Sequence, residues 1–200
     1  MRGNARGFFA VAGPRPDRRN HFRERRVGHG PHLGDREPLA LHRHSKLAFS
    51  GSIHFITTVT QTRGEWFKEE AICRGLLELF ERCRAEAGLT CLGYVLMPDH
   101  FHTLLYQKDD EPRVPDCMAA FKKWSAHNHR PADYLEGPLW RRRYDDVPVP
   151  GTMAVRTKLE YMHGNPVQAG ITNEPSRYEW SSARDYAGKQ NGIVHVWTDW

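Results

Sequence analysis

Two histidines spaced two residues apart, His100 and His102, are the side chains of this sequence best suited to metal chemistry. Apolar runs flank the Pro98-Asp99 dipeptide just before them, a pattern typical of two antiparallel strands joined by a tight turn. Because side chains alternate between the faces of a strand, both imidazoles would point to one face and Phe101 to the other. Two imidazoles on one rigid strand supply half of a divalent-metal site. The spacing also fits two histidines on a solvated sheet face.

Two other His-x-His pairs lack such support. His127 and His129 lie at the end of a segment with helical periodicity, where residues two apart diverge by about 200° and cannot share a metal. His42 and His44 lie in an arginine-rich segment without a pattern of secondary structure. His100 and His102 are therefore the candidate metal ligands.

Composition predicts one packed domain with an appendage. The 200 residues are 39% hydrophobic and 11% aromatic, enough for one core. The four cysteines show no C-x-x-C spacing and no secretory context, which favours reduced thiols and a cytoplasmic protein. No apolar run is long enough for a membrane span, so we expect no membrane association.

Charge divides the chain into unequal parts. Residues 1–45 carry ten arginines, no lysine and four acidic residues, a net charge of +6, whereas residues 46–200 carry 19 basic and 20 acidic groups, a net charge of −1. Residues 1–45 are predicted to be a disordered tail, which is either a phosphate-binding arm or translated sequence upstream of the true start. We expect a domain over 46–187 and a C-terminal extension over 188–200.

The regular part of the chain predicts an α+β fold. The pattern indicates strands over 53–60, 91–97 and 100–106, a short strand within 138–149 that ends at Pro148, and helices over 69–86, 118–129 and from a cap at Thr152 to 164–166. This order matches a ferredoxin-like, four-stranded antiparallel sheet with helices packed on one face, followed by a C-terminal helix.

That C-terminal helix carries a second candidate, Tyr161. It lies about 100° from the apolar stripe that includes Leu159 and Met162, so it need not point into the core beneath its helix. Asn165 follows one turn later, but Pro166 disfavours helical dihedrals at Asn165. Its amide could therefore reach a metal or cap a frayed last turn. An ordinary amphipathic aromatic residue remains the alternative for Tyr161.

Together these segments resemble a known family. The motifs are Met97-Pro98-Asp99-His100-Phe101-His102, Leu139-Trp140-Arg141-Arg142-Arg143-Tyr144, Tyr161-Met162-His163-Gly164-Asn165-Pro166 continuing to Gly170, and Trp180-Ser181-Ser182-Ala183. In this order they resemble the REP-associated tyrosine transposases, which belong to the insertion-sequence transposases with one catalytic tyrosine and a His-hydrophobe-His (HUH) motif. The resemblance covers about residues 46–187.

The resemblance implies a metal-dependent strand transferase and endonuclease that acts on single-stranded or hairpin DNA, as a monomer or homodimer. His100 and His102 would take the place of the paired metal ligands, Asn165 that of a third, amide ligand, and Tyr161 that of the nucleophile. A 5′-phosphotyrosine intermediate is implied. The donor types suit Mg²⁺ or Mn²⁺, because neutral ligands leave the ion most of its charge.

DNA contacts are expected from basic and aromatic residues near the motifs. Arginines suit phosphate groups, and a tryptophan can stack on an unpaired base. The candidates are Arg141, Arg142, Arg143, Lys122, Lys123 and Trp140. The two lysines also fit a solvated helix face, and Trp140 equally fits a core position.

Two other functions are alternatives to a transposase. A two-histidine phosphodiesterase needs two H-x-[S/T] motifs, and Leu104 stands where the first would need its hydroxyl residue. A non-catalytic module that binds hairpin DNA or RNA is the stronger alternative, since this topology also serves RNA recognition. Binding without cleavage that depends on Tyr161 would identify that case.

Deleting residues 1–45 should preserve folding and metal-dependent chemistry while weakening DNA affinity, most visibly at low salt. The reason is the charge of +6 on this segment against −1 on the remainder, which makes its contribution electrostatic. Fluorescence anisotropy of a labelled hairpin across a salt series measures this. An unchanged affinity and salt slope would exclude a DNA-binding arm.

Overall fold

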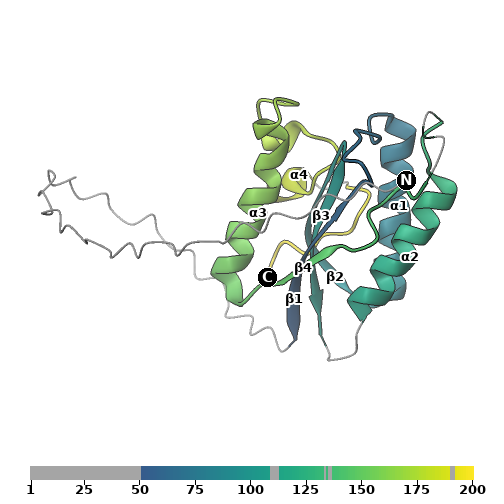
Figure 1. Cartoon of the computed structure of the whole chain (residues 1–200). Coiled ribbons are helices and arrows are strands. Elements are labelled where there is room, and N and C mark those ends of the chain that lie inside the picture. Colours follow the sequence, from purple (N-terminus) through teal and green to yellow (C-terminus); the bar gives the residue numbers. More distant parts are fainter. Residues whose placement is uncertain (1–50, 109–112, 133, 135–136, 190–191) are drawn as a thin grey trace, which may run out of the picture. The chain divides into compact units, whose positions relative to one another are not determined.

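A four-stranded antiparallel sheet organises the protein (Figure 1). The computed structural model describes residues 51–108, 113–132, 134, 137–189 and 192–200; the expected tail over 1–45 lies outside them. The strands are β1 (Ser52–Val59), β2 (Thr90–Met97), β3 (His100–Gln107) and β4 (Asp145–Pro148), in the spatial order β2-β3-β1-β4. The α+β, ferredoxin-like prediction is therefore confirmed.

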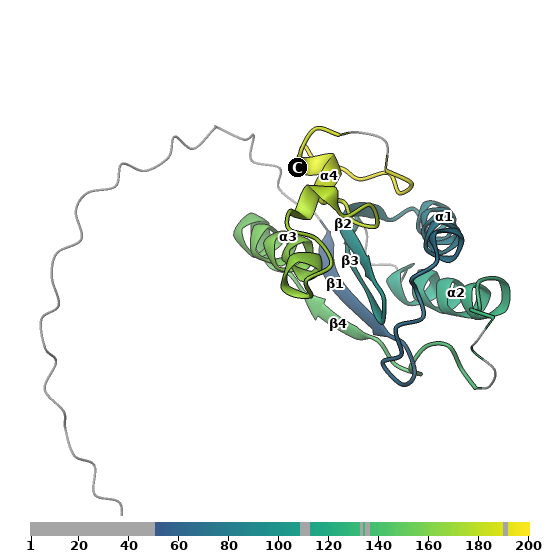
Figure 2. The same ribbon diagram turned by 90° about the horizontal axis from the view of Figure 1, so that it is seen from above.

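Helices cover both faces of this sheet (Figure 2). α1 (Glu70–Glu86) and α2 (Arg113–Asn128) pack on one face, and α3 (Gly151–Gln168), which carries Tyr161, packs on the opposite face. A short 3₁₀ helix, η1 (Pro175–Arg177), and α4 (Ala183–Tyr186) follow. The expected single helical layer thus describes α1 and α2 only, because the tyrosine helix forms its own layer.

Side chains alternate between the two faces of β3 and so contribute to two hydrophobic cores, one on each face of the sheet. Phe101 points toward α1 and α2, where its ring lies 4.8 Å from Phe80 and 5.5 Å from Phe121 between centroids. Leu104 joins the other core, beneath α3. β3 is paired on both sides, by β2 and by β1, so its backbone hydrogen bonds hold it rigidly.

α2 begins at Arg113, five residues before the expected start. The side-chain Oε1 of Gln107, at the end of β3, accepts hydrogen bonds from the backbone N–H groups of Arg113 and Val114 at 3.1 and 3.3 Å. This oxygen satisfies two donors that a helix start leaves unpaired. Local sequence could not reveal a cap that comes from a neighbouring strand.

α3 also differs from its predicted bounds. Pro150 occupies the N-cap position and Thr152 lies inside the helix, so the predicted cap at Thr152 is wrong. The helix continues through Pro166, a buried residue, to Gln168. Asn165 therefore stays helical, and its carbonyl accepts a hydrogen bond from Ala169 N–H at 2.9 Å.

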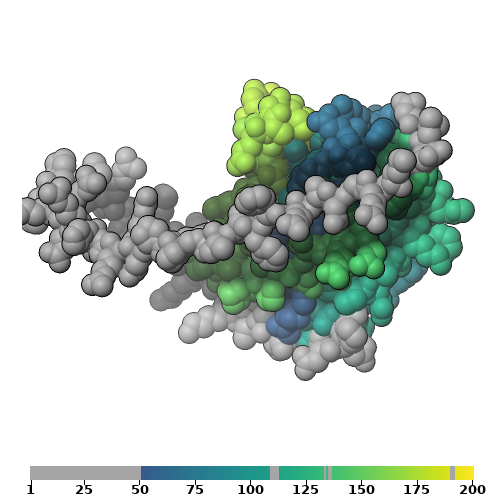
Figure 3. Space-filling model, in the orientation of Figure 1, coloured from purple at the N-terminus to yellow at the C-terminus, as the bar shows by residue number. Residues whose placement is uncertain are grey.

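The expected fourth strand is shorter than its sequence pattern. Only Asp145–Pro148 pairs continuously with β1, preceded by a single bridge between Thr60 and Trp140. All four β4 residues are exposed at the sheet edge, and the green segment that contains them lies at the surface in Figure 3.

Residues after α3 cover the outer edge of β2. Backbone hydrogen bonds join Leu96 N–H to Trp180, and Trp197 N–H to Cys91, at 2.8 and 2.9 Å. Val194 is fully buried in the core beside α1. The described part of the predicted extension, residues 188–189 and 192–200, therefore packs with the domain. Within the described residues, no helix is long and apolar enough to cross a membrane.

A close approach at Gly93 sets the fit between α3 and the sheet. A Cβ atom at this β2 position would lie 2.4 Å from Leu159 Cδ2 and 3.3 Å from Ser182 Oγ. A side chain at position 93 would therefore push α3 away from the sheet, and so away from the histidines on β3.

The substitution Gly93→Ala should lower the free energy of unfolding by about 1–3 kcal/mol, because the added methyl group forces α3 or the Leu159 side chain to shift. Gly164→Ala on α3 is the matched control: its Cβ would meet only Gln168 Nε2 at 3.4 Å, and removing a helical glycine should stabilise by about 0.5–1 kcal/mol. Urea unfolding measures both. Equal effects of the two changes would contradict the packing argument.

Candidate active site

His100 and His102 lie on the α3 face of β3, with ring centroids 4.7 Å apart and planes at 74°. This is the shared face that the period of two predicts. Phe101 between them is buried on the opposite face. The strand therefore anchors the pair from behind while presenting both rings toward α3.

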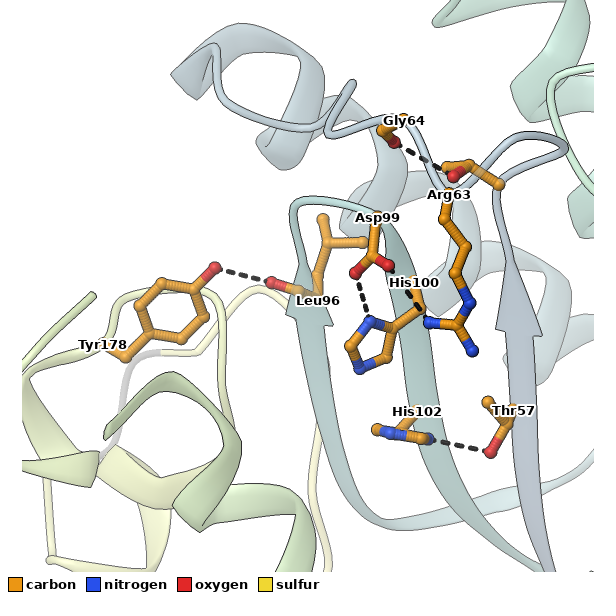
Figure 4. A network of polar contacts seen from close by, with 9 residues as sticks. Thr57, Arg63, Gly64, Leu96, Asp99, His100, His102 and Tyr178 are labelled. Atoms are coloured by element: carbon orange, nitrogen blue, oxygen red, sulfur yellow. Dashed lines mark hydrogen bonds and ion pairs between the residues drawn. The ribbon is translucent and has the colours of Figure 1, made fainter. Parts of the chain in front are cut away.

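Each imidazole is held through its Nδ1 atom (Figure 4). His100 Nδ1 lies 2.5 Å from Asp99 Oδ1, and the other carboxylate oxygen of Asp99 accepts a hydrogen bond from Arg63 Nη1 at 3.3 Å. His102 Nδ1 lies 2.8 Å from Oγ1 of Thr57, its register partner on β1. These contacts leave the Nε2 atom of each ring for a further ligand, as second-shell partners of metal-bound histidines do.

Burial keeps His102 uncharged. Its side chain is only 4% exposed and stacks on Phe55 with centroids 5.1 Å apart. Burial is the main cause that lowers the pKa of His102 to about 3, with a smaller contribution from the nearby ammonium group of Lys158. A neutral imidazole with an unshared electron pair is the form that binds a metal.

Tyr161 reaches this site from α3. The residue is 48% exposed, and its ring centroid lies 5.6 Å from that of His102 and 6.1 Å from that of Phe55. Tyr144 lies elsewhere: it packs against the α1–α2 core, with Lys122 Nζ 5.9 Å from its ring centroid. The structure therefore brings Tyr161 to the histidines and keeps Tyr144 on the other side of the sheet.

Asn165 lies one helical turn beyond Tyr161. Tyr161, four residues before Asn165, contacts His102. Ala169, four residues after Asn165, lines a cavity together with His100. Asn165 therefore lies along the chain between a residue that contacts His102 and a residue that lies near His100. Its Nδ2 atom is buried without a hydrogen-bond partner among the described residues. Within the described residues, no hydrogen bond joins Asn165 to either histidine. An unpaired amide N–H group can donate a hydrogen bond to an acceptor such as a phosphate oxygen, whereas a metal ion would bind the carbonyl oxygen of this side chain.

Four polar residues of the site were not predicted from the sequence. Thr57, Arg63 and Asp99 orient the histidines, and Lys158 brings a positive charge, with Nζ 4.7 Å from the centroid of Phe55. Only Lys158 and Asp99 left a local signal: Lys158 is three residues before Tyr161 on one helical face, and Asp99 adjoins His100. Thr57 and Arg63 become neighbours only through strand pairing and the turn that follows β1.

The expected DNA contacts fall into three groups. Arg141, Arg142 and Arg143 are exposed. Lys122 instead donates hydrogen bonds to the carbonyl groups of Arg141 and Arg142 at 2.6 and 3.0 Å, so it supports the arginine segment. Lys123 is exposed, with Nζ 5.1 Å from the ring centroid of Trp124.

Trp140 is not placed to stack on DNA. It is 3% exposed, its Nε1–H donates to Ser125 Oγ at 2.7 Å, and its ring lies 5.0 Å from Phe67. The predicted base contact is therefore replaced by the core position that the sequence equally allowed. The exposed tryptophan is Trp124, on α2.

Among the described residues, no three His, Cys, Asp or Glu side chains form a group that could hold a metal ion. The candidate metal ligands of this site are His100, His102 and Asn165, and an asparagine is not one of those four residue types. Such neutral nitrogen and oxygen ligands leave open positions on an ion.

Known proteins share this sequence and fold. The sequence profile of the IS200-like transposases matches residues 48–165. No curated protein matches the chain. A REP-associated tyrosine transposase, solved bound to a REP hairpin, matches with a TM-score of 0.52 and 16% identity over 80% of this chain and 92% of that one. A protein from Deinococcus radiodurans R1 assigned as a transposase matches with a TM-score of 0.45 and 20% identity, over 62% of this chain and 97% of that one.

The REP-associated structure shares the fold of the described domain, and the family profile spans more than half of the sequence, including both histidines, Tyr161 and Asn165. This chain therefore belongs to the IS200-like transposase family.

Proposed function

We propose that this protein cleaves and rejoins single-stranded DNA by a metal-dependent reaction in which Tyr161 is the nucleophile. The observation that carries the proposal is the approach of the half-exposed Tyr161 ring to the buried, neutral His102 across the α3–sheet interface. A transposase of this type needs a nucleophile beside a site that neutralises phosphate charge, and the nearness of Tyr161 to His102 supports these roles for the two residues.

Mg²⁺ or Mn²⁺ would be held by the Nε2 atoms of His100 and His102 together with the amide of Asn165. The anchored Nδ1 atoms support the two histidines in this role. Asn165 would contribute its carbonyl oxygen Oδ1, because the amide nitrogen is a hydrogen-bond donor and does not bind a cation. When bound, the ion would neutralise a non-bridging oxygen of the scissile phosphodiester. Asp99 and Thr57 keep the two rings oriented for that role.

The reaction balances without an external energy source. The Tyr161 oxygen forms a bond to phosphorus while the bond from phosphorus to the 3′-oxygen breaks, giving a 5′-phosphotyrosine and a free 3′-hydroxyl group. The tyrosine proton leaves to solvent, which reaches this half-exposed side chain, and the 3′-oxygen takes up a proton. Because one phosphoester replaces another, the step reverses to rejoin or transfer the strand.

Lys158 would hold the substrate near the nucleophile. It lies one turn before Tyr161 on α3, and its ammonium group lies over Phe55, the ring that both His102 and Tyr161 contact. A lysine here can attract a phosphate without occupying the position of a metal ligand.

Hairpin or single-stranded DNA is the proposed partner. The REP-associated neighbour was solved with a REP hairpin, and exposed Arg141, Arg142 and Arg143 offer phosphate contacts on this chain. Lys122, by binding the backbone of two of these arginines, would fix the segment that presents them.

The substitution Tyr161→Phe should abolish covalent protein–DNA adducts, because it removes the only oxygen proposed to attack phosphorus. Tyr144→Phe is the matched control and should keep wild-type adduct yield. Denaturing gels of a labelled hairpin oligonucleotide with single-stranded arms, incubated in Mn²⁺, measure both. Adducts formed by the Tyr161→Phe protein would refute the assignment, and hairpin binding without adducts in wild type would indicate a non-catalytic binding module.

The substitutions His100→Ala and His102→Ala should each weaken Mn²⁺ binding by about tenfold or more and abolish cleavage, while hairpin binding measured without a divalent ion stays mostly intact, because the phosphate contacts proposed for Arg141, Arg142 and Arg143 lie elsewhere. His127→Ala on α2, on the opposite face of the sheet, is the control. Titration calorimetry with Mn²⁺ alone and gel shifts with the hairpin separate the effects. Equal loss of DNA binding and cleavage would assign the pair a structural role.

A further inference from the structure

A second recess adjoins the histidine site. It has a volume of about 450 Å³ and lies between the segment that precedes α1, the β2–β3 turn and the residues that follow α3. His100 and Asp99 form part of its lining, and apolar side chains supply much of the rest, namely Phe67, Met97, Ile171 and Trp180. The recess therefore opens directly beside His100, one of the two histidines of the candidate site.

Hydrogen bonds fix the walls of this recess. Phe67 N–H donates to the Pro98 carbonyl at 3.0 Å, which ties the segment before α1 to the β2–β3 turn. The Tyr178 hydroxyl donates to the Leu96 carbonyl at 2.8 Å, as Figure 4 shows, and Leu96 N–H donates to the Trp180 carbonyl. The recess is thus built from backbone-anchored segments and exists before any ligand binds.

Its chemistry suits a nucleobase better than a phosphate. Apolar and aromatic walls favour a flat ring, whereas the carboxylates of Asp99 and Glu65 on the lining disfavour an additional anion. At the same lining, Lys68 Nζ and Glu65 Oε2 form an exposed ion pair of 2.6 Å. A hydrogen-bond donor and an acceptor side by side match the polar edge that every base presents.

We propose that this recess receives the base of one unpaired DNA nucleotide next to the phosphate that Tyr161 attacks. The inference deepens the proposed function and rests on it for the identity of the bound strand. His100 lines the recess and also carries one of the proposed metal-binding nitrogens, so a nucleotide joined to the scissile phosphate would have its base within reach. The recess would then select where along the strand the protein cuts.

Ile171 offers a way to fill the recess without disturbing the core. It lines the recess yet is 46% exposed, so a larger side chain can be accommodated from the solvent side. Ile171→Trp should therefore block entry of a base. Val167→Trp is the matched control, because Val167 is another β-branched residue near the end of α3, is 36% exposed and does not line the recess. Circular dichroism and thermal melting verify that both variants fold.

The test uses binding, which is independent of cleavage. In a Tyr161→Phe background, the best-bound oligonucleotide is selected from a pool of hairpins whose single-stranded arms are randomised. Single nucleotides of that oligonucleotide are then replaced in turn by abasic residues, and affinity is measured by gel shift.

We expect one arm position at which loss of the base lowers affinity by about tenfold, the size of one lost base-stacking contact. Val167→Trp should retain that effect. Ile171→Trp should bind the intact oligonucleotide about tenfold more weakly and show little further loss at the abasic position, because the two changes remove the same contact. Uniform sensitivity along the arms, or an unchanged abasic effect in Ile171→Trp, would overturn the proposal.

The adduct assay keeps this inference separate from the proposed function. If protein with Tyr161 intact forms no adduct in Mn²⁺ but the abasic pattern depends on Ile171, the recess binds a base and the proposed cleavage is wrong. If adducts form on Tyr161 and no arm position is sensitive, the cleavage stands and the base-binding recess is wrong.

Discussion

The alternation of side chains along β3 is the constraint on which the site depends. Phe101 is locked into the α1–α2 core, so its neighbours His100 and His102 must face α3. A shift of one residue in strand register would bury the histidines among phenylalanines in the α1–α2 core and turn Phe101 toward α3, at a large cost in free energy. Hydrophobic packing on one face of the sheet thereby fixes the chemistry on the other.

The α3 helix adds the second half of the site through a similarly close fit. Gly93 lets α3 approach β2, and Tyr161 then lies beside His102, while Tyr144 stays on the far side of the sheet. Burial keeps His102 neutral, with its pKa lowered to about 3, and Asp99 and Thr57 hold both rings by Nδ1. The site is therefore organised by the fold before any ligand or ion binds.

The sequence predicted those features of the fold and the site that depend on local hydrophobic patterns. The shared face of the histidines and the position of Tyr161 off its apolar stripe follow from periods of 2 and 3.6, and the antiparallel sheet follows from the order of strands and helices along the chain. Features that depend on distant partners were missed: Gln107 caps α2 from a strand, and Lys122 binds the backbone of the arginine segment. For Trp140 the sequence allowed both a base contact and a core position, and packing against Phe67 with a hydrogen bond to Ser125 decides for the core. Likewise, α3 continues through Pro166, whose side chain is buried, although the local preference of a residue before proline predicts that the helix ends there. Local sequence rules do not include such tertiary packing.

Peptide mapping of the covalent protein–DNA adduct tests the central claim most directly. Trypsin cleaves after Lys158 and Arg177 and after Arg143 and Arg156, so Tyr161 and Tyr144 fall in separate peptides, 159–177 and 144–156. Mass spectrometry of the wild-type adduct, formed on a hairpin oligonucleotide in Mn²⁺ and trimmed by nuclease, should find the 5′-phosphonucleotide on Tyr161 in the first peptide. A modified peptide 144–156, or an adduct on any residue other than Tyr161, would contradict this account.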